Sequence, residues 1–211
     1  MLRAFFCAGL SAWRCFVCVA LLVMSASAAH RMCCWTVWKN WSTAVRFAGV
    51  ALALDGGIRV VKSKGRLTQL RQKLAAQVLA QSFCGIGHTR WATHGEPSDV
   101  NSHPHSTPRV SIVHNGIIEN YGILKERLMA KGYTFESETD TEVLVKLIDS
   151  CYEGEPLKAL RAALAMVRGS YALAVLFRDF PDTLFAVKRE SPLIVGWGEE
   201  ENFMRRISRR C

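Results

Sequence analysis

Two short apolar runs enclose a long polar segment in the middle of the chain, and this arrangement constrains the fold more than any other feature. The runs at 83–88 and 109–114 have the length and residue types of buried strands. The segment between them is rich in His, Arg, Trp, Thr and Pro, and Asn115-Gly116 ends the second run. A polar segment held between two strands is typical of a binding loop on a rigid scaffold.

The rest of the body combines strand hairpins with pairs of helices. Gly49–Leu54 and Ile58–Lys62 flank the turn signal Asp55-Gly56-Gly57, which predicts a hairpin. Apolar periodicity predicts helices at 67–80, 119–130, 143–151 and 156–167, and further strands at 171–177, 184–187 and 193–197. Strands in hairpins and helices in pairs favour a layered α/β or α+β architecture over a Rossmann alternation.

Local signals mark the ends of two of these helices. Gly132 is the expected stop of the helix at 119–130, because glycine tolerates the left-handed conformation that ends many helices. Thr139 and Glu142 have the spacing of a capping box, which predicts a helix start at this point.

The formal net charge of +9 comes entirely from the two ends of the chain. Residues 51–204 carry equal numbers of acidic and basic side chains. The excess is made up of Arg3, Arg14, Arg31, Lys39, Arg46, Arg205, Arg206, Arg209 and Arg210. Since the body has no basic excess that could neutralise phosphates, nucleic acid is not expected as a partner.

The cysteines are also concentrated at one end, and five of the eight lie in the first 34 residues. Their spacings fit neither a zinc site nor a disulfide framework, which favours a reducing cytosol. The sequence also has no glycine-rich phosphate loop of the dinucleotide or P-loop kind. We therefore expect a cytoplasmic protein with no cofactor and no metal.

The segment Met1–Ala29 has an alternative interpretation as a secretory signal. Basic residues come early, an apolar run follows at 16–24, and Ala26-Ser27-Ala28 has the composition of a cleavage site. A membrane-spanning helix is disfavoured because the uninterrupted apolar stretch is too short. The next segment, Cys33–Trp41, holds three Trp and two Cys and matches neither a helical nor a strand period.

Several polar residues are candidates for a binding site, each with a purely structural alternative. The Arg90 guanidinium suits a carboxylate held by two hydrogen bonds, or a surface ion pair. Asn115-Gly116 can supply two adjacent N–H donors for an oxyanion, or form a plain turn. Asp140 can bind an ammonium group, or stabilise the first turn of its helix. The spacing of the four histidines His94, His103, His105 and His114 fits no common metal site.

Taken in order, three segments closely resemble one family. His88–Pro97, His114–Asn120 and Ser137–Glu142 are similar to the glutaminase domain of glutamine–fructose-6-phosphate aminotransferases, which are class II glutamine amidotransferases. The resemblance covers about residues 48–203. It implies an N-terminal-nucleophile hydrolase fold over residues 47–204, a layered αββα sandwich with antiparallel sheets. It also implies that glutamine is hydrolysed to supply ammonia to a sugar phosphate.

The resemblance further implies a role for individual residues. Arg90, Thr93 and His94 would hold the α-carboxylate of L-glutamine, with Trp91 in a mobile loop that closes over the site and His103 close to that loop. Asp140 would hold the α-ammonium, and Asn115 and Gly116 would stabilise the oxyanion. A clamp on the two charged groups of glutamine is a sensible way to position its amide.

The resemblance has consequences for partners as well. Fructose 6-phosphate would bind only through an isomerase domain, which we expect to be absent. The family's homodimer is not expected to be preserved, and a membrane is not an expected partner. An inactive glutamine-binding remnant and the glutaminase domain of another class II amidotransferase remain alternatives.

The family's nucleophile is a cysteine exposed as residue one in Met-Cys-Gly-Ile-Val-Gly, and its own α-amine serves as the base. This chain has no such start. Codons can be chosen for Cys18–Leu22 and Trp38–Ala44 so that the frame one base back reads Met-Cys-Gly-Ile-Val and Leu-Glu-Tyr-Arg. The segment 205–211 similarly yields a family continuation, Ala-Ser-Asp-Ile-Pro-Ala-Leu, in another frame.

We therefore expect residues 1–46 and 205–211 to be out-of-frame translation on either side of an incomplete glutaminase core. The chain as written is expected to be inactive because it lacks the nucleophile. Cys84-Gly85-Ile86-Gly87 matches the missing start in letters only, since a buried strand offers no free amine.

Overall fold

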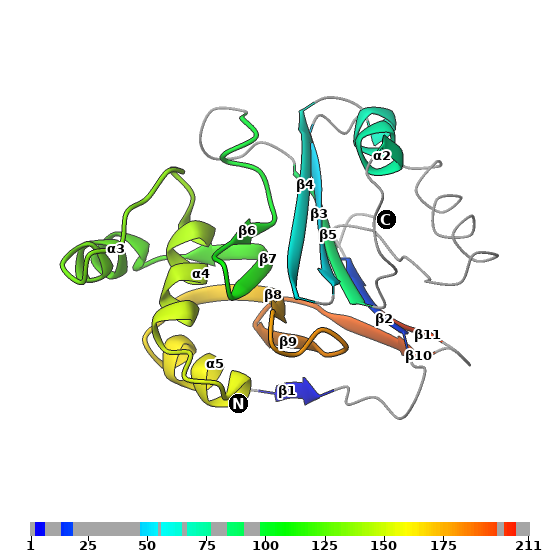
Figure 1. Ribbon diagram of the computed structural model, residues 1–211. Coiled ribbons are helices and arrows are strands. Elements are labelled where there is room, and N and C mark those ends of the chain that lie inside the picture. Colours follow the sequence, from blue (N-terminus) through cyan, green and yellow to red (C-terminus); the bar gives the residue numbers. More distant parts are fainter. Residues whose placement is uncertain are drawn as a thin grey trace.

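The computed structural model describes residues 3–6, 14–18, 47–54, 56–64, 67–76, 84–90, 98–197 and 201–205. Within them, two β-sheets pack face to face, and helices cover the outer faces of both (Figure 1). The strands are β1 (Arg3–Phe6), β2 (Arg14–Cys18), β3 (Phe47–Leu54), β4 (Gly57–Lys64), β5 (Cys84–Arg90), β6 (His105–Ser106), β7 (Val110–Ile118), β8 (Gly169–Phe177), β9 (Leu184–Arg189), β10 (Ile194–Trp197) and β11 (Glu201–Arg205). The helices are α2 (Leu67–Ala76), α3 (Tyr121–Met129), α4 (Asp140–Ser150) and α5 (Pro156–Ala165).

The five-stranded sheet has the order β1-β9-β8-β7-β6, and every neighbouring pair is antiparallel. Its central strand β8 is buried from Tyr171 onward and apolar on both faces there. Leu173, Val175 and Phe177 join the core beneath α3, α4 and α5, while Ala174 and Leu176 face the other sheet. The alternation follows from the two-residue repeat of a strand.

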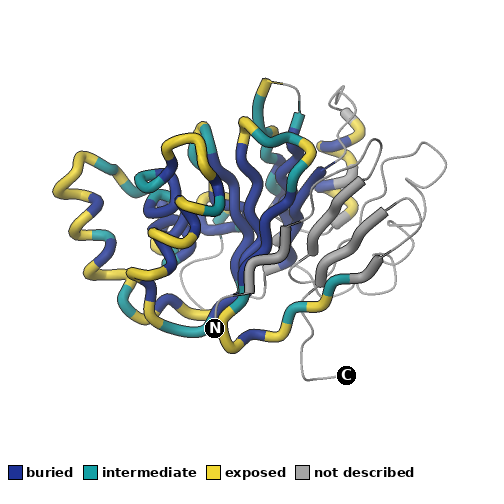
Figure 2. The backbone as a smooth tube through the Cα atoms, turned by 90° about the horizontal axis from the view of Figure 1, so that it is seen from below, coloured by how far each residue is buried: buried dark blue, intermediate teal, exposed yellow. Residues whose placement is uncertain are grey.

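The six-stranded sheet has the order β10-β11-β2-β5-β3-β4, and α2 packs on β3 and β4. This sheet is mixed, because β2 is parallel to both β11 and β5, whereas its other pairs are antiparallel. The expectation of antiparallel sheets is therefore corrected at β2. Small and branched apolar residues fill the space between the sheets, and Figure 2 shows buried residues concentrated along the strands. The expected αββα layering is confirmed.

Three local predictions are confirmed: the hairpin turn, the glycine after α3 and the N-cap of α4. The β3–β4 hairpin closes with Leu54 opposite Gly57, and Gly56 has a φ of +87°. The backbone at Gly132 turns left-handed at +89°, directly after α3. Thr139 is the N-cap of α4, and its Oγ1 accepts a hydrogen bond of 3.3 Å from the Glu142 N–H. The expected helix at 67–80 is described as far as Ala76.

Other features were not foreseen. Strand β7 does not end at Asn115-Gly116 but continues to Ile118, paired with β8 throughout. The strands β1, β2, β6 and β11 had no clear signal, since each is short and is defined by its pairing with distant residues. Of the signal-like segment 1–29, only the backbones of β1 and β2 lie within the described residues.

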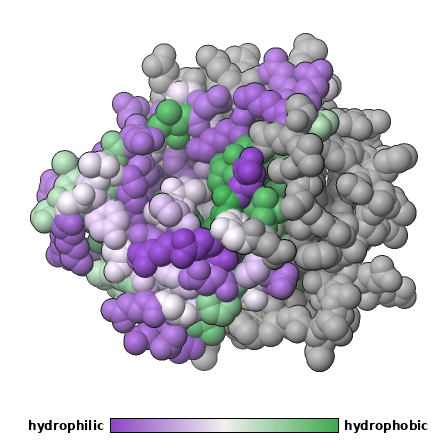
Figure 3. Space-filling view, viewed as in Figure 1, coloured by the Kyte–Doolittle hydropathy of each residue, from purple (hydrophilic) through white to green (hydrophobic). Residues whose placement is uncertain are grey.

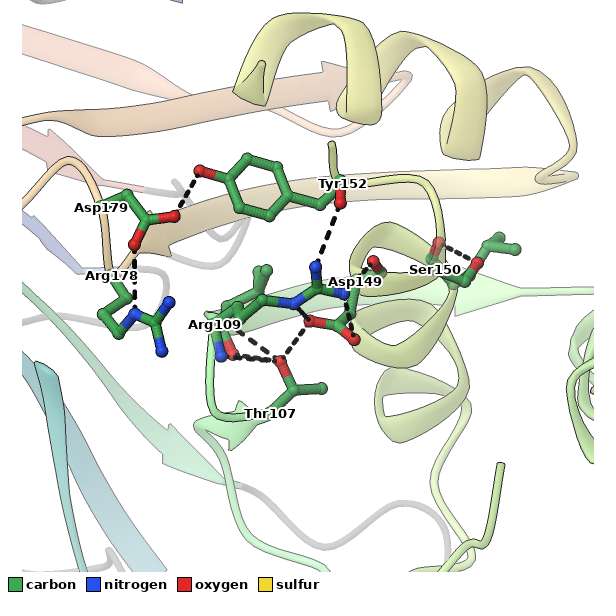
Figure 4. Close-up of polar contacts among 9 residues, drawn as sticks. Thr107, Arg109, Asp149, Ser150, Tyr152, Arg178 and Asp179 are labelled. Atoms are coloured by element: carbon green, nitrogen blue, oxygen red, sulfur yellow. Dashed lines mark hydrogen bonds and ion pairs between the residues drawn. The ribbon is translucent and has the colours of Figure 1, made fainter. Parts of the chain in front are cut away.

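One ion pair links the start of β7 to the end of α4. The Arg109 guanidinium donates to both carboxylate oxygens of Asp149 at 3.0 Å, and also to the carbonyls of Asp149 and Tyr152 (Figure 4). Thr107 donates to the same carboxylate at 2.9 Å. The bidentate geometry holds α4 against the sheet, and with it the residues at the other end of the helix.

The described surface is mixed in character. Figure 3 shows a small hydrophobic area near the middle of one face, in the region of β4, and hydrophilic residues over much of the rest. The large exposed apolar residues include Ile117, Tyr121 and Ile123. No helix in the described ranges is long and apolar enough to cross a membrane.

Candidate functional site

The structure describes four of the eight residues predicted for the site in full. Asn115 and Gly116 lie in β7, Asp140 is the first residue of α4, and His103 lies in the segment between β5 and β6. Arg90 is the last residue of β5, and its side chain is not among those described. The other three predicted residues, Trp91, Thr93 and His94, lie outside the described residues.

Asp140 is hydrogen-bonded directly to the strand that carries Asn115 and Gly116. Its Oδ2 accepts the backbone N–H of Ile118 at 2.9 Å, and its Oδ1 accepts the hydroxyl of Thr141 at 3.2 Å. The side chain is 25% exposed. A carboxylate offers about four acceptor positions, so these two bonds leave capacity for a further donor. The negative charge also lies at the N-terminus of α4, where the helix dipole stabilises it.

Gly116 can be no other residue in this backbone. Its φ is +136°, and a Cβ added to it would lie 2.0 Å from the carbonyl oxygen of Ser170 on β8. Gly169 on β8 is equally close to β7, because a Cβ added to Gly169 would lie 2.1 Å from the carbonyl oxygen of Ile117. The interpretation of Asn115-Gly116 as a plain turn is therefore wrong, because both residues pair within a strand.

The amide of Asn115 is oriented by a histidine from the other sheet. His88 on β5 is buried, and its Nε2 lies 3.3 Å from Oδ1 of Asn115. An amide oxygen can only accept, so the hydrogen lies on Nε2 of His88. With its oxygen bound to this ring, Asn115 presents its NH₂ group away from His88.

His103 lies at the centre of a group of imidazole rings. Its ring centroid is 4.3 Å from that of His88, 5.3 Å from that of His105 and 6.5 Å from that of His114. Burial lowers the pKa of His103 well below 6.5, and the charges of the neighbouring histidines and of Lys62 lower it further. His103 is therefore neutral at pH 7. Within the described part of the chain, no cluster of His, Cys, Asp or Glu is arranged to hold a metal ion.

Gly49 on β3 allows the segment carrying His103 to lie against the six-stranded sheet. A Cβ at this position would lie 2.2 Å from the carbonyl oxygen of His103 and 2.9 Å from Cδ of Pro104. Because β3 and β5 are neighbours, this close packing places His103 beside His88. The site thus forms where the two sheets and the start of α4 meet.

No role was predicted for His88 and Thr141, although the structure places both in contact with predicted residues. His88 stands in the first segment quoted for the family resemblance, two residues before Arg90, and Thr141 directly follows Asp140. The signal that could have found them is their position, since each is a polar residue within two positions of a predicted site residue.

Comparisons with known proteins identify the family of this chain. Residues 88–205 match the family model of the glutamine amidotransferase domain. The glutamine–fructose-6-phosphate aminotransferase (isomerizing) of Clostridium tetani is 55% identical over 159 residues, which are 74% of this chain and 26% of that protein. The enzyme of the same name from Thermus thermophilus is 51% identical over the same shares. The chain thus spans about a quarter of the length of the curated relatives it matches.

Solved structures show the same fold at low identity. The glutamine phosphoribosylpyrophosphate amidotransferase from B. subtilis superposes with a TM-score of 0.53 and 20% identity, covering 79% of this chain and 44% of that chain. A structure described as the allosteric regulatory enzyme of purine biosynthesis has a TM-score of 0.56 and 21% identity, with the same coverage. The expected N-terminal-nucleophile hydrolase fold is confirmed. Since the family model matches more than half of its length, the chain belongs to the glutamine amidotransferase domain family.

Proposed function

We propose that the described core is the glutamine-binding part of a glutaminase domain of the kind found in glutamine–fructose-6-phosphate aminotransferases. The observation that carries the proposal is the 2.9 Å hydrogen bond from the Ile118 N–H to Asp140, two residues beyond Gly116. It holds a carboxylate at a fixed distance from two adjacent N–H donors. A substrate with an α-ammonium and a distant amide needs such an arrangement to place its carbonyl.

Each predicted residue has a role in this proposal. Asp140 binds the α-ammonium of L-glutamine, while the Asn115 amide and the Gly116 N–H stabilise the oxyanion that forms as the amide is attacked. His103 is assigned to the substrate-binding residues as well, and its ring packs against that of His88, which contacts the Asn115 amide. The α-carboxylate is assigned to Arg90, Thr93 and His94, and Trp91 to the loop that covers the ligand.

The reaction is hydrolysis of glutamine to glutamate and ammonia, and it needs a nucleophile with an adjacent base. We propose that residues 1–46 and 205–211 are read in a shifted frame, so that the chain as written binds glutamine without hydrolysing it. Sequencing of the locus tests this part, and one intact frame that encodes residues 1–60 as written contradicts it.

The names of the relatives suggest the wider context. Fructose 6-phosphate would receive the ammonia in a longer protein that carries an isomerase domain, and homodimerisation would belong to that longer protein. We place the protein in the cytoplasm, with neither nucleic acid nor a membrane as a partner.

Calorimetric titration with L-glutamine tests the binding site. Asp140→Asn should weaken binding about tenfold to a hundredfold, since a hydrogen bond to a charged group contributes about 1.5–3 kcal/mol. Glu138→Gln is the matched control, because it removes one negative charge from an exposed side chain close to the same helix start. Equal affinity of Asp140→Asn and the control would refute the assignment.

A glutaminase assay separates binding from turnover. The chain as written should release no ammonia, whereas a chain restored to begin Cys-Gly-Ile before the core should do so. Measurable turnover by the chain as written contradicts the proposed loss of the nucleophile.

A further inference from the structure

We infer that Thr141 is a positioning residue that reserves the negative charge of Asp140 for the ligand's ammonium group. The inference rests on the proposed function, because it concerns the same site. Thr141 follows Asp140 in the first turn of α4 and is 1% exposed, so its hydroxyl interacts with protein groups rather than with bulk water.

Three polar atoms surround this hydroxyl. Its Oγ1 lies 2.9 Å from Nε2 of His103, 3.0 Å from Nδ1 of His114 and 3.2 Å from Oδ1 of Asp140. The three partners come from the segment before β6, from β7 and from the start of α4. One hydroxyl therefore joins three separate parts of the fold.

The chemistry of a hydroxyl determines the direction of each bond. An ionised carboxylate can only accept, so the single hydrogen of Thr141 is donated to Asp140. The oxygen then has two lone pairs and no further hydrogen, so both histidines must donate to it. His103 consequently carries its hydrogen on Nε2, and His114 carries a hydrogen on Nδ1.

The tautomer of His103 agrees with its surroundings. Nδ1 of His103 is buried and has no hydrogen-bond partner among the described atoms. A lone pair at this position costs less than a buried N–H without an acceptor, and far less than a charged ring. The ring is thus neutral, with its hydrogen directed at Thr141.

The direction of the His114 hydrogen matters for the ligand. Nδ1 of His114 lies 3.8 Å from Oδ1 of Asp140 but 3.0 Å from the oxygen of Thr141. Thr141 therefore accepts the Nδ1 hydrogen of His114, which would otherwise be donated to the Asp140 carboxylate. A protonated His114 paired with Asp140 would compete with an incoming ammonium group. Thr141 supports the carboxylate with a neutral donor and leaves its charge available.

Threonine-to-valine and threonine-to-serine substitutions separate this role from simple packing. Thr141→Val keeps the shape of the side chain and removes the hydroxyl, and we expect it to bind L-glutamine at least about tenfold more weakly. Thr141→Ser keeps the hydroxyl and should restore an affinity close to that of the unsubstituted chain. Thr134→Val is the control for the same exchange at an exposed threonine.

Nitrogen NMR of the ¹⁵N-histidine-labelled chain tests the hydrogen-bond directions without any ligand. The unsubstituted chain should show His103 as the Nε2–H tautomer and His114 as the Nδ1–H tautomer at pH 7.5. In Thr141→Val the signal of His114 should shift towards that of a ring paired with a carboxylate. A charged His114, or a hydrogen on Nδ1 of His103, in the unsubstituted chain would overturn the inference.

Failure of the proposed function and failure of the inference about Thr141 give different experimental results. If the unsubstituted chain binds no glutamine, the proposed function is refuted, whereas the tautomers still decide the role of Thr141 in the hydrogen-bond network. Folded Thr141→Val that binds glutamine as tightly as the unsubstituted chain refutes the positioning role. The tautomers of the unsubstituted chain need no variant, so a misfolded variant does not remove the test.

Discussion

The carboxylate of Glu142 makes three hydrogen bonds that hold the segment before α4. Its Oε1 accepts from the Glu136 N–H at 3.1 Å and from Nζ of Lys146 at 2.6 Å, and its Oε2 accepts from the Ser137 N–H at 2.6 Å. The residue is 7% exposed, so water screens these contacts little. Replacing Glu142 with Gln keeps the shape of the side chain but removes the charge and one acceptor oxygen.

The pKa of Glu142 gives the size of the effect. Burial alone would raise this pKa, but the hydrogen bonds from Lys146, Ser137 and the backbone of Glu136 outweigh burial and lower it from 4.5 to about 2. Such a shift corresponds to roughly 3 kcal/mol, at about 1.4 kcal/mol per pKa unit. The single amide oxygen of Gln can satisfy only part of these donors, so we expect Glu142→Gln to lose about 2–3 kcal/mol of unfolding free energy at pH 7.

Urea denaturation at several pH values measures this loss. A carboxylate with a lowered pKa contributes stability that is present above its unfolded pKa and is lost as the pH falls towards the folded value. The difference between the unsubstituted chain and Glu142→Gln should therefore stay constant above about pH 5 and shrink towards pH 2. The exposed Glu138→Gln is the control and should change stability by less than about 0.5 kcal/mol. The reasoning fails if Glu142→Gln matches this control, or if the difference is the same at pH 3 and pH 7.

Three further predictions concern the backbone of the site, the Arg109 ion pair and pH. Gly116→Ala should lose at least about 2–3 kcal/mol of unfolding free energy in a thermal melt, because position 116 has a positive φ and a β8 carbonyl lies close to it. Gly122→Ala, in open space on α3, should be neutral or slightly stabilising, and equal melts of the two variants would show that the close approach is not required. Arg109→Lys should lose about 1–2 kcal/mol of unfolding free energy in urea, because lysine cannot make the bidentate contact with Asp149. Arg178→Lys, in an exposed ion pair, should lose under about 0.5 kcal/mol, and similar losses in the two variants would contradict the prediction. Since the pKa of His103 is lowered in the fold, the unfolded chain takes up its proton first, and stability should rise with pH up to about 6.5, by at most about 1.4 kcal/mol per pH unit for this group. Urea midpoints measured from about pH 5 to 7 check this prediction. If the midpoint of His103→Gln rises with pH as steeply as that of the unsubstituted chain, other groups cause the pH dependence.

Features that depend on a few neighbouring residues were readable from the sequence. Gly56 and Gly132 adopt the positive φ expected of a turn and a helix stop, and Thr139 caps α4 as its spacing with Glu142 predicts. The carboxylate of Glu142 departs from the expected box, since it binds the N–H groups of Glu136 and Ser137 rather than that of its N-cap. Strands in hairpins and helices in pairs left α+β and layered α/β open, and the family resemblance implied the αββα layering that the structure shows.

The arrangement of the site depended on contacts between distant residues. Asn115-Gly116 after an apolar run has the sequence of a turn, and only the approach of Ser170 on β8 shows that the strand continues through it. The contacts of His88 with Asn115, and of Thr141 with His103, join the two sheets to the start of α4.

By itself, then, the sequence determined most of the longer elements, the family and the predicted site residues, because these follow from local periodicity and from three recognisable segments. Only the tertiary structure decided which atoms of those residues meet and in which direction their hydrogens lie. The physical reason is that the direction of a hydrogen bond depends on which partner carries the hydrogen and which offers a lone pair. Those partners, such as His103 and Thr141, come together only when the sheets and α4 have packed.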